Sequence, residues 1–111
     1  MIKMVLTFKR RAGMSMTEFK AYRRDVHAPR LLAIPEARHI RRFVVSYPAV
    51  APDWPSPSYD ALVEAWFDTL DDMNALFLSE NFRNQVDPDH SAFIDLSSVQ
   101  RMVAEETVVL G

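Results

Sequence analysis

The chain has 111 residues, about half of them apolar and a quarter charged, which is the composition of one globular domain spanning residues 1–111. It contains no cysteine, which excludes disulfides, thiolate nucleophiles and cysteine-ligated metals. No stretch approaches the roughly 18 apolar residues of a membrane span, so we expect a cytoplasmic protein with no membrane partner.

The net charge of −2 conceals an uneven distribution. Residues 1–42 hold 11 of the 13 Lys and Arg side chains, whereas residues 43–111 hold 12 of the 15 acids. A basic half can mark a surface for nucleic acid or another anion. The simpler interpretation is that the two halves interleave in the fold and neutralise each other, so we expect no nucleic-acid partner.

Residues 1–10 alternate apolar and polar side chains and predict a first strand. Ser15 and Glu18 have the spacing of a capping box and predict the start of a helix. One face of this helix is an apolar stripe of Phe19, Tyr22 and Val26. The other is a basic face of Lys20, Arg23 and Arg24. Pro29 disfavours helical geometry at the preceding residue, so we expect the helix to end near His27, with a short turn over residues 30–35.

Two more strands are predicted over residues 38–47 and 59–68, separated by a loop over residues 48–58 that has four prolines. Thr69 is placed to cap a second helix. Short turns over residues 79–86 and 87–96 then lead to a last strand over residues 97–110.

This order of strands and helices predicts an α+β, ferredoxin-like βαββαβ fold, with a four-stranded antiparallel sheet and both helices on one face. The third strand is apolar on both faces, carrying Leu62 and Trp66 on one and Val63 and Phe67 on the other. A second copy could cover the face without helices through one self-complementary patch. We therefore expect a homodimer shaped as a dimeric α/β barrel.

His27 is the first candidate for catalysis, because an imidazole exchanges protons near neutral pH and this one lies where a loop is predicted. The alternative is that His27 only meets the negative end of its helix. Glu64 is the second candidate. A carboxylate on a covered sheet face needs a partner or a raised pKa, although a surface ion pair with an arginine would account for it equally well.

Ligand-binding candidates are the aromatic residues that could line a pocket and the histidine that begins the second strand: Tyr22, Phe43, Trp66 and His39. Plain core packing is the alternative for the aromatics. His90 follows Asp87 and Asp89, but no further ligand cluster supports a metal site there, so we expect no metal. The two glycines are too few for a phosphate-binding loop or a dinucleotide fingerprint.

Three pieces of the chain carry a family resemblance: Arg23 to Pro29 ending in His-Ala-Pro, Glu64-x-Trp66-Phe67, and the pair Glu105-Glu106. With the segments around them, they resemble EthD-domain proteins of the dimeric α+β barrel superfamily, over nearly the whole chain except the proline-rich loop. The resemblance implies a homodimer with a cavity between each sheet and its own helices. Related proteins are auxiliary proteins of degradative operons, muconolactone-type isomerases, and cyclases or dehydratases of polyketides.

Reactions of these relatives typically need no metal, flavin or nicotinamide, so the resemblance implies no cofactor. It also implies that His27 corresponds to a proposed acid/base, assisted in relatives by a tyrosine whose position here holds Ile40. Tyr47 and Tyr22 are the remaining nearby tyrosines.

Two functions stay open. One is a cofactor-independent isomerase, cyclase or dehydratase acting on a hydrophobic or aromatic carbonyl or lactone compound, in which His27 moves the proton, Glu64 orients the imidazole and Trp66 packs the ligand. The other is a non-catalytic binding or auxiliary protein for a small hydrophobic metabolite of a degradative or biosynthetic pathway.

Overall fold

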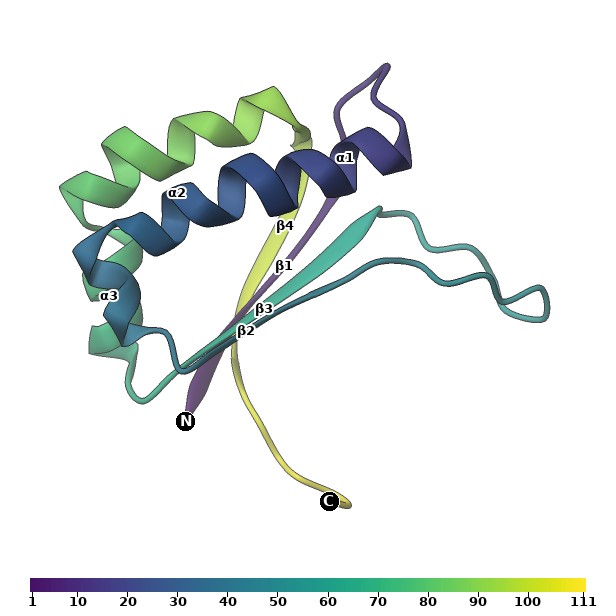
Figure 1. Ribbon diagram of the computed structural model, residues 1–111. Helices are drawn as coiled ribbons and strands as arrows, with labels where there is room; N and C mark the ends of the chain where they lie inside the picture. The colour runs from purple at the N-terminus through teal and green to yellow at the C-terminus, as the bar shows by residue number, and fades with distance from the viewer.

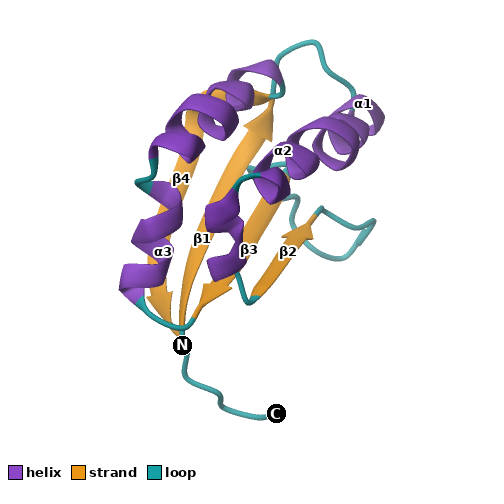
Figure 2. Ribbon diagram, turned by 60° about the vertical axis from the view of Figure 1, so that its left-hand side comes forward, coloured by secondary structure: helices purple, strands orange, loops and turns teal.

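The computed structural model describes residues 1–111 as one sheet with a layer of helices on one of its faces (Figures 1 and 2). Every neighbouring pair of strands is antiparallel. The strands lie in the order β2 (Arg42–Ser46), β3 (Ala61–Phe67), β1 (Ile2–Arg10), β4 (Ile94–Glu105). This order, with helices following β1 and β3, confirms the predicted ferredoxin-like fold.

The first helical segment begins as predicted but continues past the predicted end. Ser15 and Glu18 form both hydrogen bonds of the capping box before α1 (Met16–Tyr22). The chain then passes through a π-helical turn, Arg23–His27, into α2 (Ala28–Ala33). The prediction that the helix ends near His27 was wrong, because the wider π turn, in which Ala28 N–H bonds Arg23 O, accommodates Pro29 without breaking the helix.

The π turn also decides which side chains face the sheet. Phe19, Arg23, His27 and Leu31 are all buried, at intervals of four residues. The predicted basic face was therefore wrong in one member: Lys20 and Arg24 are exposed, but Arg23 is 5% exposed and lies against the sheet. Arg23 and His27 thus lie in line with the core residues Phe19 and Leu31.

The second helical segment starts at α3 (Leu70–Phe77), capped by Thr69, whose side chain accepts a hydrogen bond from Asp72 N–H. A π turn (Phe82–Val86) and a 3₁₀ turn (Asp87–Ala92) follow before β4. A further 3₁₀ turn, Pro35–His39, lies between α2 and β2. None of these helices is long and apolar enough to cross a membrane.

β2 and β4 are the strands that differ most from their predicted ranges. β2 starts at Arg42 rather than Arg38, because Pro35 begins a 3₁₀ turn in that place. β4 runs from Ile94 to Glu105 rather than over residues 97–110. Its last residue pairs with Ile2 at the start of β1, so the chain beyond has no strand to bond and leaves the sheet as a tail (Figure 1).

The two faces of the sheet have opposite surroundings. On the helix side, Ala61, Val63, Ala65 and Phe67 are each at most 1% exposed and belong to two apolar clusters. On the helix-free side, a row of paired residues crosses all four strands: Val44, Glu64, Val5 and Met102. Met102 is 56% exposed.

Bases of the first half pair with acids of the second half at three places away from the cavity: Lys3 with Glu64, Arg10 with Asp60 and Arg41 with Asp68. The fold brings the two halves together because β1 lies between β3 and β4. The uneven charge of the sequence is thus partly neutralised within the chain, as the simpler interpretation expected.

Candidate active site

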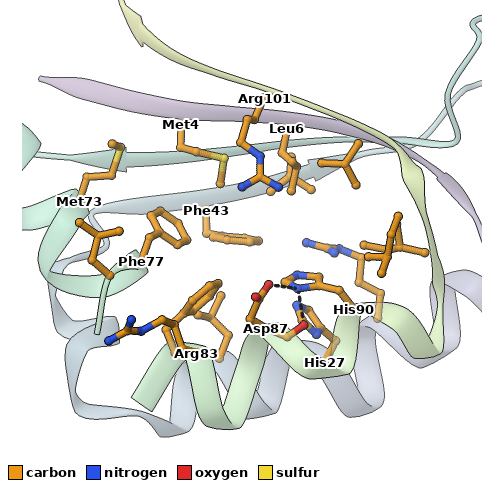
Figure 3. A pocket seen from close by; sticks show the side chains of 18 of the residues that line it. Met4, Leu6, His27, Phe43, Met73, Phe77, Arg83, Asp87, His90 and Arg101 are labelled. Carbon is orange, nitrogen blue, oxygen red and sulfur yellow. Dashed lines mark hydrogen bonds and ion pairs between the residues drawn. The ribbon is translucent and has the colours of Figure 1, made fainter. Parts of the chain in front are cut away.

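A cavity of about 430 Å³ lies between the helix side of the sheet and the helical layer (Figure 3). Its volume falls within the range of about 300–1,000 Å³ typical of small-molecule sites. Most of its wall is apolar. The sheet contributes Met4, Leu6, Phe43 and Val63, and the helical layer contributes Leu31, Met73 and Phe77.

His27 lies in the wall of this cavity and is 4% exposed. Its Nδ1 is 3.0 Å from Oδ2 of Asp89, which is itself 7% exposed. A carboxylate can only accept, so Nδ1 carries the hydrogen and Nε2 keeps its lone pair. The other carboxylate oxygen of Asp89 accepts a short hydrogen bond from the Tyr22 hydroxyl and lies 3.6 Å from Arg30 Nη1. The imidazole is thereby fixed in one tautomer and one orientation.

Burial is the largest cause acting on the imidazole. Together with the neighbouring His90, it lowers the pKa of His27 from 6.5 to about 4, against the opposing effect of Asp89. Burial alone would raise the pKa of Asp89, but hydrogen bonds from Tyr22 and His27 and the charge of Arg30 outweigh it and lower that pKa. At neutral pH the site therefore holds a neutral imidazole beside an ionised carboxylate, which is the protonation state of a general base.

A second imidazole, His90, lies beside the first, with ring centroids 4.5 Å apart. Its Nδ1 is 3.0 Å from the Asp87 carbonyl oxygen and 3.1 Å from Asp87 Oδ1, so this nitrogen also carries a hydrogen that it donates (Figure 3). Both histidines line the cavity, and each has Nε2 free of hydrogen bonds within the chain. The site thus offers a ligand two imidazole nitrogens side by side.

The other charged groups in the cavity wall are three arginines, Arg23, Arg83 and Arg101, and the carboxylate of Asp87. No group of three or more histidine, cysteine or carboxylate side chains is placed to hold a metal ion.

The sequence-predicted site residues divide between the two sheet faces and the edge of the helical layer. His27 and Phe43 line the cavity, and Tyr22 lies behind His27 as a donor to Asp89. Glu64 does not reach His27: it lies on the helix-free face, 2.8 Å from Lys3 Nζ. The orienting role predicted for Glu64 is met in the structure by Asp89.

Trp66 also lies on the helix-free face, where its ring contacts Lys3 and Arg42 and its indole N–H bonds Glu106. It cannot pack a ligand held in the cavity, since the sheet separates the two. His39 does not line the cavity, and its Nδ1 lies 3.4 Å from Asp72 Oδ1. Neither Tyr22, Tyr47 nor Tyr59 contributes to that wall.

Sequence reasoning missed Asp89, His90, Arg23 and Arg101. Asp89 and His90 were noticed only as a weak metal pattern, because their distance from His27 along the chain gives no signal of contact. A usable signal was the period of four from Phe19 to Leu31, which places Arg23 and His27 in the same line as two core residues.

The fold and the sequence both have relatives among known proteins. An EthD family protein from Bacillus halodurans C-125 matches at 18% identity and a TM-score of 0.73, over 96% of this chain and 99% of that one. An EthD-like protein from Ralstonia eutropha JMP134 matches at 17% identity and a TM-score of 0.72, over 98% and 94%. A dimeric protein of ferredoxin-like fold from Bacteroides fragilis matches at 16% identity and 0.57, over 95% of each chain.

At these identities the structural likeness shows the fold alone. No curated protein matches the chain in sequence. The model of the EthD domain matches residues 11–97, which include α1, α3, the histidine pair, the strands β2 and β3 and the start of β4. The chain belongs to the EthD domain family.

Proposed function

We propose that the protein is a small enzyme without cofactor that moves a proton on a hydrophobic or aromatic carbonyl or lactone compound, as an isomerase, cyclase or dehydratase does. One observation carries the proposal: His27, fixed by Asp89, lies in the wall of an apolar cavity with Nε2 free. A buried neutral imidazole oriented by a carboxylate is the arrangement in which histidine acts as general base.

In the proposed reaction, His27 Nε2 removes a proton from the carbon next to the carbonyl and leaves an enolate. The imidazolium that forms is stabilised by the ionised Asp89 through Nδ1–H. Return of the proton to another carbon isomerises the compound. If the enolate carbon instead attacks a second carbonyl, a ring closes, and the imidazolium returns its proton to the alkoxide that forms. The apolar wall keeps water away from the enolate and aligns the substrate.

The experiment follows exchange of the α-protons of 2-tetralone, an aromatic ketone, into deuterated water by NMR. We expect the wild-type protein to accelerate the exchange above buffer, and His27→Gln to lose about 10²–10⁴-fold, the usual contribution of a general base. His39→Gln is the matched control, because that imidazole lies outside the cavity. An equal rate in wild type and His27→Gln would remove His27 from the reaction.

The second candidate is a binding or auxiliary protein that shelters a hydrophobic metabolite. It is favoured by the absence of any tyrosine hydroxyl from the cavity wall, which leaves no neutral oxygen acid to assist His27. In that case a ligand binds with His27-dependent affinity but is recovered unchanged, without deuterium at carbon.

We propose further that the protein is a homodimer joined through the helix-free face, with no nucleic-acid partner. The row of Val44, Glu64, Val5 and Met102 on that face carries no helical cover. An isologous contact needs only this one patch. The Bacteroides fragilis protein of like fold is itself described as dimeric. Sedimentation at micromolar concentration tests the proposal, and a monomer would contradict it.

A further inference from the structure

The side chain of Arg23 is charged and buried, yet it has no partner in the chain. The residue is 5% exposed and its guanidinium forms no hydrogen bond or ion pair. Its Nε is fully enclosed with no acceptor. Buried charges are normally paired, because removing them from water is costly, so an unpaired one calls for an explanation.

Neighbouring groups do not supply that partner. The carboxylate of Asp89 already serves Tyr22, His27 and Arg30, and the carboxylate of Asp87 serves His90. What surrounds Arg23 instead is aromatic, with three phenylalanine rings 5.6–5.9 Å from its Cζ. Such contacts offset part of the cost of burial but satisfy no N–H. Burial lowers the pKa of Arg23 to about 10, so the guanidinium remains charged at neutral pH.

Arg23 lines the cavity, and a second unpaired arginine enters the cavity from the sheet. Arg101 stands on β4 opposite Leu6, in the row that continues to Val63, so it points to the helix side. Figure 3 shows its side chain directed from the sheet toward the histidine pair, whereas the end of Arg83 points away from that pair. No hydrogen bond or ion pair within the chain involves the guanidinium of Arg101 or of Arg83, and Arg101 is exposed. The cavity therefore has an apolar body with an excess of positive charge next to His27.

We infer that the natural ligand is an apolar molecule that carries a carboxylate, which binds Arg23 with Arg101 as its second partner. Guanidinium and carboxylate have matching planar geometry and can form two parallel hydrogen bonds. The apolar body lies against Met4, Phe43 and Phe77. The inference concerns the ligand of the proposed site and holds for turnover and for simple binding alike.

A matched pair of probes isolates the charge. 2-Naphthoate and 2-naphthamide have the same shape, but only the first is anionic at pH 7. We expect isothermal titration to give a dissociation constant at least about 10-fold lower for naphthoate with the wild-type protein, because charged hydrogen bonds are stronger than neutral ones. Equal affinities, or no binding of naphthoate at millimolar concentration, would overturn the inference.

Three variants then locate the preference. Arg23→Met keeps an unbranched side chain in the core and should abolish the preference for naphthoate. Arg101→Gln changes an exposed residue, so folding is not at risk, and it should reduce the preference severalfold. Arg24→Gln is the control, because Arg24 pairs with Asp25 away from the cavity and should leave the preference unchanged. A preference of wild-type size in Arg101→Gln, or any preference retained in a folded Arg23→Met, would contradict the assignment.

The outcome is separable from that of the proposed function. His27→Gln should lose proton exchange on 2-tetralone and still bind naphthoate more tightly than naphthamide. If wild-type protein shows the binding preference but no exchange, the ligand class stands and the reaction does not. If it shows exchange but no binding preference, the reaction stands and the proposed ligand class does not.

Discussion

Both faces of the sheet carry charged side chains among apolar residues, but the charges differ in burial and in whether they are paired. On the helix-free face, Lys3 meets Glu64 at 2.8 Å and lies over Trp66, and both charged side chains keep about a fifth of their surface exposed. On the helix side of the same sheet, Arg23 is 5% exposed and unpaired. The same types of residue thus form a satisfied pair on one face and an unsatisfied site on the other.

This difference separates charges that stabilise the fold from charges that are held for a ligand. A partly exposed ion pair is worth little to the fold and costs little. A buried guanidinium without an acceptor lowers stability and persists only where something else compensates or a function requires it. Glu64 was therefore a catalytic candidate in the sequence, but in the structure it is paired with Lys3. Arg23 was assigned to the basic face of its helix, but in the structure it is the buried charge that lacks a partner.

The largest expected effect separates two carboxylates: Asp89, which orients His27 in the structure, and Glu64, which the sequence predicted for that role. Asp89→Asn removes the acceptor that fixes the imidazole tautomer and should lower proton exchange on 2-tetralone by on the order of 10²–10⁴-fold. Glu64→Gln removes a carboxylate on the other face and should change the rate less than about twofold. NMR exchange rates decide the matter, and a large loss in Glu64→Gln would return that residue to the mechanism.

A second comparison uses pH. The folded pKa of His27 is about 4 against 6.5 for an ordinary histidine, so between these values the unfolded chain takes up a proton that the folded chain does not. Stability should therefore fall by about 3 kcal/mol as the pH drops from about 6.5 to 4, since each pKa unit corresponds to about 1.4 kcal/mol. Below about pH 4 a further loss follows, because the pKa of Asp89 is lowered by folding and its protonation ends that contribution.

Urea unfolding between pH 4 and 7 measures this dependence. His27→Gln should flatten the curve over this range, because the substituted side chain does not titrate. His39→Gln, which removes an imidazole outside the cavity, should leave the curve as in the wild type. If the free energy of unfolding falls equally with decreasing pH in wild type and His27→Gln, burial of the imidazole does not cause the loss of stability in acid.

The third comparison concerns a core substitution that we expect to stabilise the protein, whereas most core substitutions destabilise it. Arg23→Met replaces a buried unpaired cation with an apolar chain of similar reach, and should raise the free energy of unfolding by about 1–2 kcal/mol. Lys3→Met breaks a partly exposed pair on the other face and should change stability by at most about 1 kcal/mol. Urea unfolding at pH 7 tests both, and a destabilised Arg23→Met would mean that the aromatic contacts alone justify the arginine.

Local signals in the sequence were sufficient for the fold. The capping box at Ser15, the cap at Thr69 and the alternation of residues 1–10, which predicts β1, each depend on residues close together in the chain, and all three elements are present in the structure. Their order then leaves few topologies open. The extent of β4 was less accessible, because its end is set by where β1 runs out, at Ile2.

Most of the site depended on contacts between segments that are far apart in the chain. His27 and Asp89 are 62 residues apart, and only the packing of the two helical segments brings them within 3.0 Å. Arg23 was assigned to a basic face because, in a regular helix, it lies with Lys20 and Arg24 opposite the apolar stripe, and a π turn is not visible in composition. Glu64 was selected because β3 is apolar on both faces, but alternation alone does not reveal which face the helices cover.

The smallest change to the chain itself should come from Met102→Lys, in the same row of the sheet as Glu64 and Val5. Met102 is 56% exposed, so the substitution should alter the stability of a single subunit by no more than about 0.5 kcal/mol. In an isologous dimer, however, the interface buries two added charges, one from each copy. We expect sedimentation to show a dimer for the wild type and a monomer for Met102→Lys at micromolar concentration. Because the sheet separates this position from the cavity, the preference for naphthoate over naphthamide should persist in the monomer. If that preference disappears with the dimer, the two faces are not independent, and a second copy contributes to the site.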